Sequence, residues 1–243
     1  RLSEYIYLTS KGALWINQYI GNSSSLTIPS SSSNESIKVK IKMHSFLPWT
    51  GTGKLRVSLS KPHKFTIQFR IPSWTQKGVL KINQQEIPIQ NPITNKKYRE
   101  THVTGPNPYR SHYYPLVREW KDGDTIEWDF NTSIRLRISH PFVKRRKKRL
   151  AIMRGPLLYC YEPCLNPRVD IKDVELSLDR NNYRMAKLSD LDSNNNSEYL
   201  VIIHKSKNHP PIHLSPYFYW GNISPGEAMY IWLPFHLSNK ESD

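Results

Sequence analysis

Residues 36–45 read SIKVKIKMHS, a stretch in which apolar and polar side chains alternate without interruption. Successive side chains of a β-strand point to opposite faces, so this spacing places one face in a core and the lysine face in water. The same alternation recurs along the chain, at 54–59 (KLRVSL), 65–71 (FTIQFRI), 126–130 (IEWDF) and 134–138 (IRLRI). The pattern predicts an all-β protein built from short antiparallel strands.

The amino-acid composition excludes two further classes of protein, disordered chains and membrane proteins. The chain has 243 residues with 35 Lys or Arg against 20 Asp or Glu, and the formal net charge is +15. The hydrophobic fraction of 37% excludes a charge-rich disordered chain. No apolar run approaches the roughly 18–20 residues of a membrane helix, so no membrane partner is expected. The chain opens without Met or a signal peptide and is expected to belong to a longer polypeptide. The compartment stays open, with a slight preference for the secretory pathway.

Turn residues and loops divide the strands into two groups. The Ser-rich residues 23–34 are expected to form a polar loop, and Pro, Gly and Asp-Gly turns recur between strands as in sandwiches and jelly rolls. Six consecutive basic residues at 144–149 follow the first group of strands. We therefore expect two consecutive antiparallel β-sandwich domains, jelly-roll-like, at residues 1–140 and 141–243.

Four segments carry a family resemblance. They are residues 5–7 (YIY) with 14–20 (LWINQYI), 48–51 (PWTG) with 65–74 (FTIQFRIPSW), 118–126 (REWKDGDTI), and 150–162 (LAIMRGPLLYCYE) with 216–220 (PYFYW) and 231–232 (IW). Their order and spacing resemble the C-terminal β-sandwich region of the β-L-arabinofuranosidase family, glycoside hydrolase family 127. One departure is Asn83-Gln84, where the family often has Gly.

The resemblance implies a fold and an activity for the longer protein. The family consists of an N-terminal (α/α)6 barrel followed by two β-sandwich domains, and residues 1–4 match the end of the segment that leaves the barrel. The implied reaction is retaining hydrolysis of a terminal β-L-arabinofuranosyl unit by a cysteine nucleophile held near zinc. Those residues lie in the barrel, so the resemblance assigns no catalytic residue, metal ligand or cofactor to this sequence. The implied partners are the barrel of the same polypeptide and a second copy of the chain.

The sequence leaves two alternative functions for this chain. The first is a non-catalytic region that scaffolds the missing barrel, to which the zinc belongs. The second is a carbohydrate-binding module for plant or acidic glycans, since sugar rings pack well on aromatic side chains. Tyr217, Tyr219 and Trp220 form the densest aromatic cluster, and they cannot all face a core. They are the candidate substrate-binding residues.

Cysteine and carboxylate residues form two further groups, each with two interpretations. Cys160 and Cys164 flank Glu162, a set that could bind a metal if the chain bends. On an extended strand the two cysteines lie about 13 Å apart, which favours a packed thiol at Cys160. The carboxylates at 119, 122 and 124 could form a glycosidase pair, but the Asp-Gly-Asp sequence favours a tight turn.

The basic run 144–149 also has two interpretations. It is either a solvated turn or a contact for a polyanion such as an acidic polysaccharide or a nucleic acid. The run contains no aromatic residue, which speaks against nucleic-acid recognition.

Overall fold

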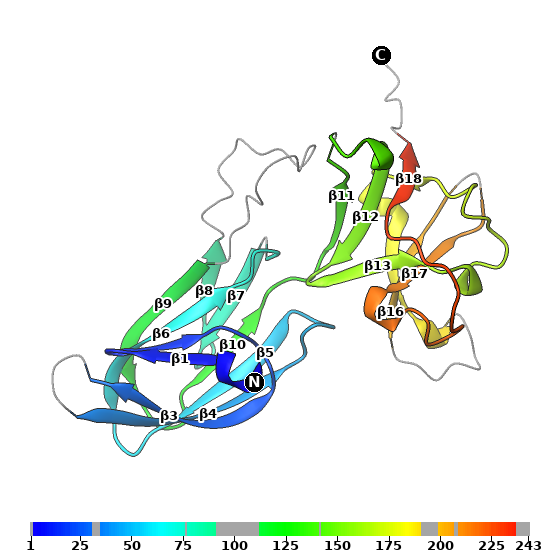
Figure 1. Ribbon diagram of the computed structural model, residues 1–243. Coiled ribbons are helices and arrows are strands. Elements are labelled where there is room, and N and C mark those ends of the chain that lie inside the picture. The colour runs from blue at the N-terminus through cyan, green and yellow to red at the C-terminus, as the bar shows by residue number, and fades with distance from the viewer. Residues whose placement is uncertain are drawn as a thin grey trace, which may run out of the picture. The chain divides into compact units, whose positions relative to one another are not determined.

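A computed structural model of the chain describes residues 2–30, 35–75, 77–90, 112–140, 142–190, 199–206 and 209–236. The prediction of an all-β protein is confirmed (Figure 1). Helical segments in these ranges are short 3-10 turns: η1 (Leu2–Tyr5), η2 (Lys144–Arg146), η3 (Pro163–Leu165), η4 (Arg180–Asn182), η5 (Leu188–Asp190) and η6 (Tyr217–Tyr219). None of these helices is long and apolar enough to cross a membrane.

The chain divides into two compact units between Thr132 and Ser133. The basic run at 144–149 predicts a later boundary, at residue 140. The difference arises because strand β11 (Ile134–Ile138) pairs along its whole length with β12 (Arg149–Arg154) of the second unit. The basic run therefore belongs to the connection between two paired strands of one unit. Alternation alone identifies a strand but not its partner.

The described residues of the first unit form two sheets. The four-stranded sheet has the order β1 (Tyr7–Ser10), β2 (Ala13–Ile16), β6 (His63–Ile71) and β9 (His112–Trp120). The six-stranded sheet has the order β3 (Asn22–Pro29), β4 (Ser36–Ser45), β5 (Thr52–Ser58), β10 (Thr125–Asp129), β7 (Lys77–Ile82) and β8 (Gln85–Gln90). The inner faces of both sheets contribute to one hydrophobic core, as the alternation predicted.

Strand β3 corrects the expectation of a loop at residues 23–34. Its residues pair in antiparallel register with β4, from Asn22 opposite Met43 to Pro29 opposite Ser36. Residues 31–34 lie outside the described part of the chain. Strong alternation in β4 provides a template that a Ser-rich neighbour can join at the sheet edge, where polar side chains and Pro are tolerated.

Aromatic rings fill one end of this core. Trp128 lies 5.0 Å from Tyr19 and 5.6 Å from Phe69, measured between ring centroids, and Tyr19 also lies 5.0 Å from Phe130. Trp128 is only 3% exposed, in agreement with the alternation at residues 126–130, which places it on the same face as Ile126 and Phe130. Its strand neighbour is Gly53, directly opposite on β5, and the absence of a side chain there leaves room for the indole.

Asp122 and Asp124 of the carboxylate cluster form a turn, as favoured from the sequence, whereas Glu119 lies on β9. Gly123 has a φ of 85°, and the flanking aspartates accept hydrogen bonds from the backbone amides of Leu59 and Lys121. Asp124 also accepts a 2.7 Å hydrogen bond from the side chain of Asn83. The carboxylates thus stabilise turns by capping polar groups.

Within its described ranges, the second unit forms one connected eight-stranded sheet. Its order is β14 (Leu176–Ser177), β18 (Leu233–His236), β12, β13 (Leu157–Tyr161), β17 (Ile212–Pro216), β16 (Leu200–His204) and β15 (Tyr183–Lys187), and β11 pairs with β12. Buried apolar side chains on β12, β13, β16 and β17 form its core. Strand β17 leads directly into η6, which carries the candidate aromatic residues.

Candidate functional site

The predicted aromatic cluster lies on η6 and the residue that follows it. The rings of Tyr217 and Trp220 are parallel within 6°, with centroids 6.5 Å apart, and their residues are 42% and 41% exposed. Tyr219 instead packs against Tyr199, at 4.2 Å between ring centroids. The structure therefore brings two of the three predicted residues together as an exposed aromatic pair. Tyr199 was missed because it is distant in sequence.

Glu227 holds the loop behind this aromatic pair. The Trp220 indole N–H donates to the backbone oxygen of Glu227 at 3.0 Å. The Glu227 carboxylate accepts from the backbone amide of Cys164 at 3.0 Å and from the hydroxyl of Ser224 at 2.9 Å. These contacts fix the indole orientation, so an exposed ring is held in place before any ligand arrives.

A buried carboxylate connects the two ends of the η6 segment. Glu162 is fully buried and accepts hydrogen bonds from the hydroxyl of Ser215 and from the backbone amide of Gly221, the latter at 3.3 Å. Ser215 precedes η6 and Gly221 follows it. A buried carboxylate is tolerated only with such partners, so Glu162 stabilises this loop rather than acting as an exposed acid.

The two cysteines are free and do not form a reactive pair. Cys160 is buried, which confirms the predicted packed thiol, and its sulfur lies 3.6 Å from the Ser215 hydroxyl. Burial raises the pKa of Cys160 to about 11, and burial together with nearby carboxylates raises the pKa of Cys164 to about 11. Both thiols are therefore protonated at neutral pH, and a protonated thiol is a weak nucleophile. Among the residues with described positions, no group of three His, Cys, Asp or Glu side chains could hold a metal ion.

A cavity of about 460 Å3 borders the same loop of the second unit. Its lining includes Cys164, Asn166 and His213. The Asn166 side chain donates to the carbonyls of Glu162 and His213 and accepts from the His213 amide, at 2.8–2.9 Å. All of the Asn166 amide's polar atoms are thus used in joining two segments, which is a structural role.

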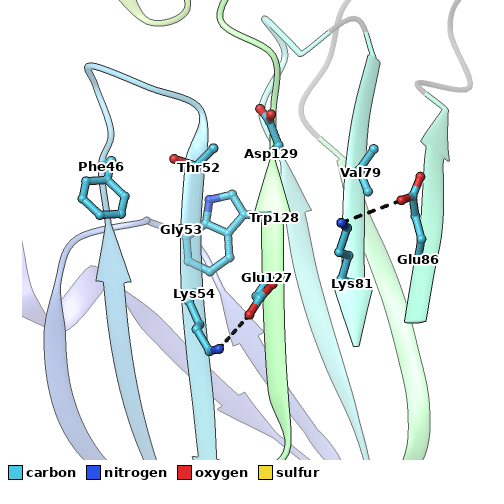
Figure 2. Close-up of a pocket in the computed structure, with 10 residues that line it drawn as sticks. All are labelled: Phe46, Thr52, Gly53, Lys54, Val79, Lys81, Glu86, Glu127, Trp128 and Asp129. Atoms are coloured by element: carbon cyan, nitrogen blue, oxygen red, sulfur yellow. Dashed lines mark hydrogen bonds and ion pairs between the residues drawn. The ribbon is translucent and has the colours of Figure 1, made fainter. Parts of the chain in front are cut away.

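A second cavity, of about 410 Å3, lies in the first unit and was not predicted from the sequence. Figure 2 shows its residues: Phe46, Thr52, Gly53, Lys54, Val79, Lys81, Glu86, Glu127, Trp128 and Asp129. Lys54 pairs with Glu127 at 2.7 Å, and Lys81 pairs with Glu86 at 4.0 Å. Both of these carboxylates are engaged by lysine on an open sheet surface. The lining comes from residues far apart in sequence, so no local motif marks it.

The basic run is exposed over residues 144–148 and partly packed at its end. The Arg146 guanidinium lies 5.4 Å from the centre of the Trp232 ring, and Arg149 donates to the Trp232 backbone oxygen at 3.1 Å. These contacts account for two of the six cations as structural groups.

Comparison with known families adds the decisive observation. A family model described as "Beta-L-arabinofuranosidase, GH127 middle domain" matches residues 13–132, and the "Glycoside hydrolase family 127 C-terminal domain" matches residues 134–234. The chain belongs to glycoside hydrolase family 127. The junction between the two matches coincides with the division between the two compact units.

Solved structures of glycoside hydrolases share the fold. A family 127 β-L-arabinofuranosidase from Geobacillus stearothermophilus is 23% identical with a TM-score of 0.72, over 97% of this chain and 35% of its own. A family 127 β-arabinofuranosidase is 20% identical with a TM-score of 0.68, over 97% of this chain and 37% of its own. A further glycoside hydrolase is 22% identical with a TM-score of 0.70, over 97% and 38%. No curated protein matches the chain. The chain thus spans little more than a third of the length of these structures.

Proposed function

We propose that this chain is the non-catalytic part of a β-L-arabinofuranosidase-like glycoside hydrolase and supports a catalytic domain that precedes it in the same polypeptide. The observation that carries the proposal is the pair of matches to a middle and a C-terminal domain, which together span residues 13–234. A middle domain implies a domain before it. The similar solved chains are much longer than this one, and that length leaves room for such a domain.

The contents of the chain agree with a supporting role. In the described ranges, the buried carboxylate Glu162 stabilises a loop, and Asp122 and Asp124 stabilise a turn. Cys160, Glu162 and Cys164 do not form a metal-binding group, since no three His, Cys, Asp or Glu side chains in the described ranges are placed to hold one ion. In this proposal the (α/α)6 barrel carries the zinc and the cysteine nucleophile.

Hydrolysis of p-nitrophenyl β-L-arabinofuranoside tests this function. The rate of p-nitrophenol release is measured for this chain alone and for the polypeptide extended upstream through the catalytic domain, each with and without zinc. We expect release only by the extended protein with zinc. Release by the short chain would place an active site within residues 1–243 and contradict the proposal.

A second candidate function is glycan binding at the Tyr217–Trp220 pair. The observation that favours it is the exposed, parallel arrangement of two rings whose loop is held by Glu162 and Glu227. We expect Trp220→Ala to abolish binding of a plant arabinan in titration calorimetry. Phe218→Ala is the matched control, because Phe218 is 51% exposed on the same turn but packs edge-on against Tyr199. Equal affinity of wild type and Trp220→Ala would remove the pair as a glycan site.

A further inference from the structure

The first three strands of the second unit lie in a stretch of sequence whose only charges are positive. Residues 131–161, which include β11, β12 and β13, contain nine Lys or Arg and no Asp or Glu. Six of the nine are consecutive, at 144–149, in the connection between β11 and β12 (Figure 1). Like charges repel one another, so such a run destabilises the folded chain unless an anionic partner offsets it.

Backbone hydrogen bonds hold this connection in one conformation. The Val143 amide donates to the His140 carbonyl, and the Arg146 amide donates to the Val143 carbonyl, both at 2.9 Å. The Ser139 amide donates to the Arg149 carbonyl at 2.9 Å and joins the two ends of the turn. The cations are therefore carried on a formed turn, and little backbone entropy remains to be lost when a ligand binds.

Four of the six cations take no part in holding the turn. Two contact Trp232, as described above. The other four are exposed: Lys144, Arg145, Lys147 and Lys148. Within the described part of the chain, none of these four side chains forms an ion pair with a carboxylate. Their charges are available to an anion from outside the chain.

Lys148 occupies a backbone position that favours a different residue. Its φ is 52°, in the left-handed region that glycine and asparagine adopt at lower cost than lysine. The requirements of the turn therefore do not account for a lysine at this position. A requirement for its charge does.

An exposed aromatic ring lies beside the cations. Phe142 is 88% exposed, and its described ring contact is with His140, at 5.0 Å between centroids in a T-shaped arrangement. Sugar rings pack on exposed aromatic faces through their C–H groups. A ligand that carries both negative charges and sugar rings therefore matches the chemistry of this turn.

We propose that residues 142–149 bind an acidic polysaccharide, a polymer of uronic acid units. Its carboxylates meet the four exposed cations, and one of its sugar rings packs on Phe142. The choice of a polysaccharide rests on the proposed function above, because the polyanion that a glycoside hydrolase meets beside its substrate is a glycan. A polymer presents many carboxylates, so several weak ion pairs form together and hold the protein on it.

Two other polyanions match the turn less well. Single-stranded nucleic acids stack successive bases on several aromatic side chains along a groove, whereas this turn offers one ring. An anionic bilayer requires an apolar anchor beside the basic residues, and even one myristoyl chain binds a membrane only marginally. Phe142 and Val143 offer less apolar surface than such a chain.

Titration of this chain with polygalacturonate tests the inference. The affinity is measured by calorimetry at several salt concentrations, and methyl-esterified polygalacturonate serves as the uncharged polymer. Because ion pairing releases counterions, we expect the affinity for polygalacturonate to fall by about tenfold or more between roughly 50 and 200 mM salt. The ester should bind at least about tenfold more weakly than the acid at the lower salt concentration. Absence of binding, or equal affinity for the ester, overturns the inference.

Two variants with the same loss of charge locate the binding site. The first neutralises the turn: Lys144→Gln, Arg145→Gln and Lys147→Gln. The control neutralises three exposed lysines of β4: Lys38→Gln, Lys40→Gln and Lys42→Gln. The turn variant should bind polygalacturonate about tenfold more weakly with a flatter salt dependence, and the control should bind nearly as wild type. Equal losses in both variants would assign the binding to the net charge of the chain and overturn the inference.

Two single substitutions test the lysine and the ring. Lys148→Gly should weaken binding without lowering the unfolding midpoint, because glycine adopts a positive φ without steric cost. Phe142→Ala should weaken binding several-fold and leave the salt dependence unchanged, because the ring carries no charge. Wild-type affinity in both variants would contradict the proposed contacts.

Further outcomes separate the ligand classes and the underlying function. Tighter binding of oligothymidylate, or of phosphatidylserine–phosphatidylcholine vesicles, than of polygalacturonate at the same salt concentration overturns the inference. In the polypeptide extended through the catalytic domain, the turn variant should keep the wild-type rate on uncharged p-nitrophenyl β-L-arabinofuranoside. Activity without polygalacturonate binding overturns this inference alone, whereas binding without activity contradicts the proposed function alone.

Discussion

Gly53→Ala is expected to destabilise the first unit strongly, because Gly53 lies against the Trp128 ring. A Cβ atom at residue 53 would lie 2.0 Å from Cζ2, 2.5 Å from Cε2 and 2.7 Å from Cη2 of Trp128. Carbon atoms prefer separations of about 3.5–4.0 Å, so the indole must move by roughly 1.5 Å. Tyr19 and Phe69 pack against the same indole at 5.0 and 5.6 Å between centroids, so they oppose its movement toward the core.

The magnitude follows from overpacking of a filled core. Such insertions cost about 1–3 kcal/mol, and the severe overlap places this one near 3 kcal/mol. At roughly 2–4 °C per kcal/mol, the midpoint of thermal unfolding should fall by about 6–12 °C. The assay is urea and thermal denaturation followed by tryptophan fluorescence and circular dichroism.

Two variants control the interpretation. Gly21→Ala introduces the same methyl group 3.7 Å from the Met43 backbone oxygen, an ordinary contact, and should shift stability by less than about 1 kcal/mol. Trp128→Phe should reduce the cost of Gly53→Ala, because the smaller ring yields space and neighbouring substitutions are not additive. Equal stability of Gly53→Ala and Gly21→Ala would refute the assigned packing.

Three further predictions concern the second unit. Glu162→Ala removes the acceptor for two hydrogen-bond donors that flank η6, and it should lower the free energy of unfolding by about 1–3 kcal/mol in urea titration. An unchanged urea midpoint would show that these two hydrogen bonds do not stabilise the loop. Alkylation of Cys160 and Cys164 by iodoacetamide should be very slow at pH 8 and should accelerate toward pH 11. The reason is that pKa values of about 11 leave ~0.1% of each thiol as thiolate at pH 8. Rapid labelling at pH 7 would contradict the raised pKa values. Burial raises the pKa of Tyr159 from 10.0 to about 12. Above pH 10 the unfolded chain therefore binds fewer protons than the native one, and the free energy of unfolding should fall between pH 10 and 12. Tyr159→Phe should weaken that fall, and an identical pH profile of stability in both proteins would contradict the assignment of the fall to Tyr159.

The strands and the residues that they bury could be predicted from the sequence, but the pairing of the strands could not. Alternation at 36–45 and 65–71 identified β4 and β6 and the faces they bury, because side-chain direction is a local property. It did not reveal that β11 pairs with β12, or that the Ser-rich β3 joins β4. Those assignments depend on a partner strand, and a partner is not encoded in the local period.

The candidate site was predictable to a similar degree. Aromatic density marked Tyr217 and Trp220, and their exposure agrees with the expectation that the cluster cannot be wholly internal. The contacts that hold them come from Glu162 and Glu227, which are adjacent only after folding. No sequence pattern predicts the charged cavity of Figure 2, because the residues that line it share neither a motif nor a regular spacing.

The central claim is that residues 1–243 support a catalytic domain without contributing a catalytic group. The most direct test adds this chain to the separately purified preceding domain, loaded with zinc, and measures p-nitrophenol release from the β-L-arabinofuranoside. The account predicts that neither part alone is fully active and that the rate rises with added chain to saturation at one chain per domain. A fully active catalytic domain whose rate and thermal inactivation do not respond to this chain would contradict it.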